Sequence, residues 1–169
     1  MPDTLADRLR SLLASDVYTE KGRLRSDDQL VRERVVRGLG ETTAAIRQLI
    51  SRWRTDEVPP STREQPFPPA DVMEPIRRAE RLIRAIDDVA TAIKGLPVLN
   101  TDKVWERVRR VGLNDLLQFD WTLVGESDVL ARDLGQVLAL NQIDIPAVET
   151  RVRRIREIIG ERQRFIEIS

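Results

Sequence analysis

The chain has 169 residues, of which 41% are hydrophobic and 33% charged, and its 28 basic side chains balance 28 acidic ones. This length is sufficient for one ordinary core, while the balanced charge removes the general attraction to polyanions on which most nucleic-acid and anionic-membrane binders depend. The sequence contains no cysteine and no histidine, which excludes disulfides, thiolate zinc sites and catalysis by a cysteine or histidine side chain.

The N-terminal part of the chain is predicted to hold a short helix at about 3–15 and then a long helix that begins at Ser26. Ser26 and Gln29 have the spacing of a capping box, in which two side chains satisfy two unpaired backbone amides. Apolar residues then follow at steps of three and four, the period of an amphipathic helix. Gly38 and Gly40 in its interior each cost about 1 kcal/mol relative to alanine, so we expect a close helix crossing or a kink there.

Residues 55–70 are predicted to be a proline-rich linker or crossover, because five of the nine prolines fall in this segment. As an extended polyproline II chain it could span about 50 Å. That reach would allow it to return along the whole preceding helix and place two helices in parallel. The same segment could instead join two semi-independent halves.

A second long helix is expected from Asp71 to Lys94, since Glu74 lies three residues after Asp71 as in a capping box. A shorter helix should follow from Thr101 to the break at Gly112.

The segment 114–141 is also predicted to be helical, in two pieces if Ser127 caps a second one. Asp144 is expected to cap the last helix, in which Arg162 is the one polar residue on the apolar stripe.

The apolar stripes around Ile83 and Ile159 are too wide for a two-stranded coiled coil. With these two isoleucines at heptad position a, position g is also apolar, being occupied by Leu82, Val89, Ile158 and Phe165. A face of about three-sevenths is typical of a helix in a globular bundle. We therefore predict an all-α bundle of about five or six helices in a single domain, 1–169, with the proline-rich crossover between the second and third helices.

Asp120 has the most unusual setting of any acidic residue, because it lies in the most apolar stretch of the chain. Burial raises the pKa of a carboxyl group unless a partner stabilises its charge, and functional carboxylates often show such perturbation. A carboxylate-dependent enzyme centred on Asp120, with Glu126 or Asp128, is therefore one hypothesis. The simpler interpretation is that Asp120 turns outward or onto an arginine.

Arg77, Arg81 and Arg84 share one helix face and are candidates for an interaction surface. They could grip phosphates, which makes a nucleic-acid-binding regulator a second hypothesis. However, Glu80 precedes Arg84 by four residues, the spacing of a stabilising pair within a helix, and no aromatic residues are interleaved for base stacking. We interpret these arginines as a solvated, self-paired face.

Two further features bear on partners. Arg63, Pro66 and Pro69 match the basic-x-x-Pro-x-x-Pro pattern of polyproline ligands, although a proline-rich spacer produces such a match easily. Trp105 lies one position off the apolar stripe of its helix and is predicted at a boundary or an interface.

The hypothesis we favour is a non-enzymatic interaction, scaffold or regulatory protein, because wide apolar stripes are present and no catalytic constellation is found. It predicts a protein partner or a homo-oligomer, and neither a cofactor nor a nucleic acid. No apolar run approaches the roughly 18 residues of a membrane span, and the N-terminus lacks the pattern of a signal peptide. We therefore expect no membrane partner and a cytoplasmic location.

Overall fold

The computed structural model describes residues 24–96 and 102–168, and the regular elements in these ranges are all helical. In chain order they are α2 (Leu24–Asp56), α3 (Ala70–Lys94), α4 (Asp102–Val111), α5 (Leu113–Gly135), the 3-10 helix η1 (Leu140–Gln142) and α6 (Ile145–Ile168). Five α-helices in the described ranges confirm the predicted all-α bundle. The helix predicted at about 3–15 lies outside the described residues.

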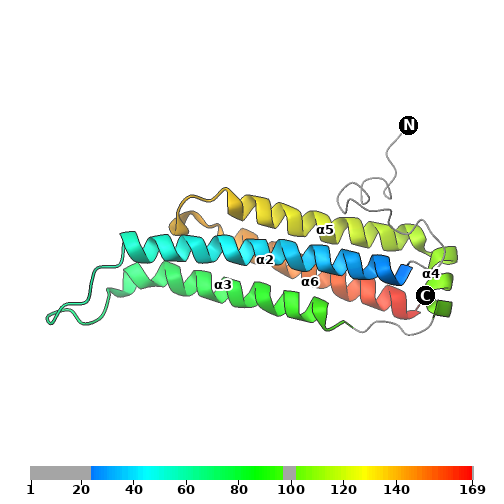
Figure 1. Cartoon of the computed structure of the whole chain (residues 1–169), viewed down its shortest axis with the longest axis horizontal. Coiled ribbons are helices and arrows are strands. Elements are labelled where there is room, and N and C mark those ends of the chain that lie inside the picture. The colour runs from blue at the N-terminus through cyan, green and yellow to red at the C-terminus, as the bar shows by residue number, and fades with distance from the viewer. Residues whose placement is uncertain (1–23, 97–101, 169) are drawn as a thin grey trace.

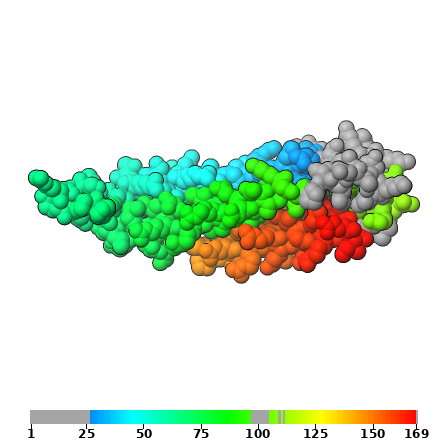
Figure 2. Space-filling model, turned by 90° about the horizontal axis from the view of Figure 1, so that it is seen from below, coloured from blue at the N-terminus to red at the C-terminus, as the bar shows by residue number. Residues whose placement is uncertain are grey.

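Four long helices form an elongated bundle made of two antiparallel hairpins (Figure 1). One hairpin is α2 with α3 and the other is α5 with α6, while the short α4 lies at one end and packs on α5. The hairpins pack so that α2 lies beside α5 and α3 beside α6. Each of these neighbouring pairs runs in the same direction in Figure 1. The space-filling view shows the same long shape, with α3 and α6 exposed along one side (Figure 2).

The core consists of the apolar stripes that the periodicity predicted, and it also takes up most of the position-g residues. Leu82, Val89 and Ile158 are buried, and Phe165 is half-buried against the core. The width of the stripes therefore reflects packing within the bundle, where each helix contacts two long neighbours.

The predicted helix starts agree with the structure at one of three places. Asp144 does cap α6, since its Oδ1 accepts a hydrogen bond from the Ala147 amide at 3.0 Å. The capping box at Asp71 is wrong: α3 begins one residue earlier, after Pro69, and no side chain caps it. Pro69 occupies the N-cap position and has no side-chain oxygen that could accept from the first amides of the helix. Ser26 falls inside α2, which begins at Leu24.

The proline-rich connection joins the second and third predicted helices as expected, but it turns back at once (Figure 1). A tight turn closes it: the Thr62 amide donates to the Gln65 carbonyl, and the Gln65 amide donates to Thr62 Oγ1, both at 3.1 Å. The helices α2 and α3 are therefore antiparallel, and the long parallel return considered from the sequence does not occur. Because Arg63 lies within this turn, the polyproline pattern is not extended over its whole length.

The helix α5 is continuous from Leu113 to Gly135, so the two-piece alternative, in which Ser127 caps a second helix, does not occur. Ser127 is buried and its hydroxyl donates to the Val124 carbonyl at 2.9 Å instead of capping a new helix. It faces Gly38 of α2, where an added Cβ would lie 3.1 Å from Ser127 Oγ. The glycine-rich segment of α2 thus marks a close helix crossing, but only at Gly38. At Gly40 an added Cβ would have no described heavy atom within 4 Å.

Within the described residues, none of the helices is long and apolar enough to cross a membrane.

Candidate functional site

Asp120 is fully buried and contacts an arginine, as the simpler sequence interpretation held. Arg162 of α6 donates from Nε to Asp120 Oδ1 at 2.5 Å. The same guanidinium reaches α2, where its Nη1 lies 2.7 Å from Asp28 Oδ1. A buried charge requires a partner of opposite charge. Arg162 on the apolar stripe of α6 and Asp120 in the apolar stretch of α5 are therefore partners of each other.

This buried network joins three of the long helices, α2, α5 and α6, and the residue Leu96 just beyond the fourth, near one end of the bundle. Asp28 also binds Arg32, with 2.8 Å between Oδ2 and Nη2. Arg32 Nη1 in turn donates to the carbonyl of Leu96, just after the C-terminus of α3, at 2.8 Å. Buried ion pairs and charge-assisted hydrogen bonds hold charged groups at short range, so the network fixes the relative positions of the helices. We assign it a structural role.

The carboxylates proposed for an enzyme do not assemble into a site. Glu126 binds Arg151 and Asp128 binds Arg34, each at 2.8 Å, while Asp120 binds Arg162. Each acid is thus directed to a different arginine. No group of three or more acidic residues in the described ranges could hold a metal ion.

Trp105 belongs to the core, with only 4% of its surface exposed. Its ring is therefore not offered to a partner, contrary to the sequence expectation. The helix α4 packs on α5 and places both Trp105 and Val108 in the core.

The three arginines of the predicted surface on α3 differ in their surroundings. Glu74 Oε1 accepts hydrogen bonds from Arg78 at 2.9 Å and from Arg81 at 3.4 Å. The hydrogen bond from Arg78 is the main reason why the pKa of the Glu74 carboxyl is lowered, and that from Arg81 adds to the effect. Arg77 is exposed and pairs with no carboxylate of the described residues.

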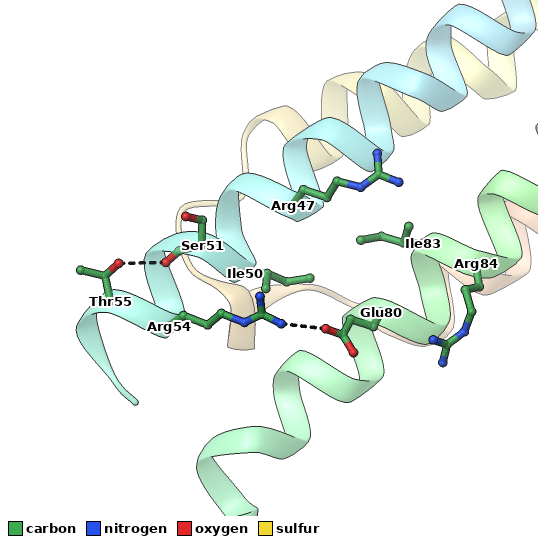
Figure 3. Close-up of a pocket in the computed structure, with 8 residues that line it drawn as sticks. All are labelled: Arg47, Ile50, Ser51, Arg54, Thr55, Glu80, Ile83 and Arg84. Carbon is green, nitrogen blue, oxygen red and sulfur yellow. Dashed lines mark hydrogen bonds and ion pairs between the residues drawn. The ribbon is translucent and has the colours of Figure 1, made fainter. Parts of the chain in front are cut away.

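Arg84 lies instead in a groove between α2 and α3 (Figure 3). We call this space, of about 490 Å³, the arginine groove. It is lined by Arg47, Ile50, Ser51, Arg54 and Thr55 from α2 and by Glu80, Ile83 and Arg84 from α3. The two isoleucines point toward one another between the helices, and the longer polar side chains surround them.

Ion pairs across the groove connect α2 to α3, and one of them occupies the carboxylate that was expected to pair with Arg84. Arg54 donates to Glu80 at 2.9 Å, and Arg47 donates to Asp87 at 3.0 Å. Glu80 was expected to pair with Arg84 along the helix. Because it pairs across to Arg54, Arg84 has no carboxylate partner in the ranges 24–96 and 102–168.

The sequence pattern indicated Arg84 but not its neighbours on α2. Arg47, Ser51 and Arg54 are spaced by four and three residues, so they lie on one helix face. This spacing is visible in the sequence and places the three polar residues next to the apolar stripe of the same helix. Nothing in the sequence indicated which face of α3 would meet it, because that depends on the antiparallel turn at 57–69.

Comparison of the chain with protein-family models, with curated proteins and with solved structures gives no significant match.

Proposed function

We propose that this protein is a non-enzymatic helical interaction protein whose arginine groove binds an acidic segment of a partner protein. The observation that supports the proposal is the exposed Arg84 guanidinium, which lacks a carboxylate partner among the described residues while Glu80 is held by Arg54. A cation left in this way beside two further arginines attracts a carboxylate.

The lining of the groove favours a peptide segment over a free inorganic anion. The lining contains three arginines and one glutamate, so its charge is complementary to acidic side chains. Ile50 and Ile83 between the arginines offer apolar contact, which an inorganic anion could not use. An extended or helical segment that alternates acidic and apolar side chains would satisfy both features.

The existing ion pairs are weak enough to be exchanged. The side chains of Arg47 and Asp87 are 57% and 49% exposed, and those of Arg54 and Glu80 are 56% and 41% exposed. Exposed pairs of this kind contribute roughly 0–1 kcal/mol. An incoming carboxylate can therefore share or replace them, and we expect a Kd between about 1 μM and 1 mM at low salt.

The test is a titration of the isotope-labelled chain, followed by NMR through the arginine Nε–Hε signals. The probe is a short peptide of glutamate and leucine, and a peptide with glutamine in place of glutamate is the control. We expect shifts at Arg47, Arg54 and Arg84 with the acidic peptide alone. They should diminish as salt rises above about 0.1 M.

Matched variants test whether the groove is the site. Arg84→Gln should raise the Kd by about tenfold, because one charge-assisted contact is lost. Arg153→Gln, on an exposed residue of α6 that pairs with no described carboxylate, should leave it unchanged. Equal binding by the glutamine peptide, or equal loss in both variants, would refute the proposal. Tighter binding of a uridine oligonucleotide than of the peptide would favour the nucleic-acid hypothesis instead.

A further inference from the structure

The two loops at one end of the bundle carry exposed apolar side chains. The 57–69 connection between α2 and α3 and the 136–144 segment between α5 and α6 both lie at this end (Figure 1). Phe67 in the first is 80% exposed and Leu138 in the second is 78% exposed. They are two of the four large apolar side chains found exposed among the described residues.

The same end of the bundle has an apolar recess. A groove of about 390 Å³ lies between the start of α3 and the η1–α6 segment. Pro75, Leu140, Ile143 and Ile145 form its apolar lining, and its charged lining consists of Asp71, Glu74 and Arg78. We call this space the end groove. Its volume is in the range of ordinary ligand pockets, which begin at about 300 Å³, so a phenyl ring has room to enter.

The charges next to the protruding and the recessed parts are complementary. Arg63 lies four residues before Phe67 in the exposed turn, and no described carboxylate pairs with it. Asp71 at the end groove is exposed and likewise pairs with no described cation. Glu74 and Arg78, which also line the end groove, pair with each other, so the recess carries one excess negative charge at Asp71 and the protruding turn carries a positive charge at Arg63.

From these features we infer that the chain forms a symmetric dimer through this end of the bundle, with Phe67 of each copy seated in the end groove of the other. A twofold interface needs a self-complementary patch, in which a protrusion and a recess on one copy meet their counterparts on the second. Here one end of the molecule carries both, with Arg63 placed to approach Asp71 of the second copy. This dimer is independent of peptide binding in the arginine groove, whose lining residues are different.

Sedimentation velocity of the full chain from about 1 μM to 1 mM tests the dimer. The sedimentation coefficient should rise with concentration, and Phe67→Ser should raise the dimer Kd by at least about tenfold, since two phenyl rings return to water. The matched control is Ile168→Ser, which removes an apolar side chain that is 83% exposed at the opposite end, and it should leave the Kd unchanged. A chain that stays monomeric throughout, or a dimer that Phe67→Ser does not weaken, would overturn the inference.

Disulfide trapping gives an independent test of the arrangement, because the chain has no cysteine of its own. Phe67→Cys and Asn141→Cys chains, mixed and oxidised, should form a mixed dimer, since Asn141 lines the end groove. Phe67→Cys mixed with Ile168→Cys should not. A charge exchange completes the design: Arg63→Glu and Asp71→Arg should each weaken the dimer, and the double variant should recover it. Equal trapping at both positions, or no recovery in the double variant, would contradict the proposed seating.

Discussion

Replacement of Arg162 by methionine should destabilise the bundle more than replacement of Arg84, Arg151 or Arg153. Methionine keeps much of the apolar volume of the arginine stem but removes the charge that Asp28 and Asp120 share. These aspartates are 1% and 0% exposed, so water cannot replace the lost contact. Removing one partner from a buried ion pair costs roughly 3–5 kcal/mol. We expect a loss near the lower limit, about 3 kcal/mol, because Asp28 keeps its contact with Arg32.

The assay is equilibrium unfolding in urea, followed by circular dichroism at 222 nm and by tryptophan fluorescence. Arg151→Met is the matched control on the same helix, since Arg151 forms a part-exposed pair with Glu126 that should contribute roughly 0–1 kcal/mol. A second variant, Arg162→Met with Asp120→Leu, should recover part of the loss because one of the two carboxylates is removed with the charge. If Arg162→Met costs no more than Arg151→Met, the network has no structural role and the reasoning fails.

Three further predictions concern helix packing and helix ends, and each can be measured by the same unfolding assay. Gly38→Leu should destabilise by about 1–3 kcal/mol because it forces apart a close crossing. Gly40→Leu, in open space on the same helix, should stabilise by up to about 0.8 kcal/mol, and a similar result for both would refute the assigned crossing. Asp144→Ala should cost about 1 kcal/mol through loss of the α6 cap, whereas no measurable change would show that the cap is dispensable. The pKa of Glu74 is lowered in the folded state by its hydrogen bond from Arg78, so the stability it contributes is present above the ordinary glutamate pKa and lost as the pH falls through the lowered value. Glu74→Gln should therefore lower stability slightly at neutral pH and not in strong acid, and a difference that persists in acid would contradict this origin.

The helices themselves follow from local chemistry, which is why the sequence predicted them. The three-four spacing of apolar residues and the Asp144 cap are properties of one segment at a time, and both agree with the structure. The close crossing at Gly38 was also expected from the sequence, but the sequence did not show that the helix crossing there would be α5. The errors lie at helix boundaries, such as Asp71, which falls inside a helix that begins after Pro69 and has no side-chain cap.

The contacts between helices could not be read in this way, because they depend on how the segments are arranged in space. Arg162 and Asp120 each stood out in the sequence as a charge in an apolar setting, but only the packing of α5 against α6 brings them together. Likewise, Glu80 has two arginines within reach, Arg84 on its own helix and Arg54 on the neighbouring helix α2. The antiparallel turn after α2 determined that choice, and it left the Arg84 guanidinium without a carboxylate partner among the residues that the structure describes. Sequence alone therefore determined the helices and their apolar faces, whereas the tertiary structure decided which charges are paired, because an ion pair needs two groups within a few ångströms of each other.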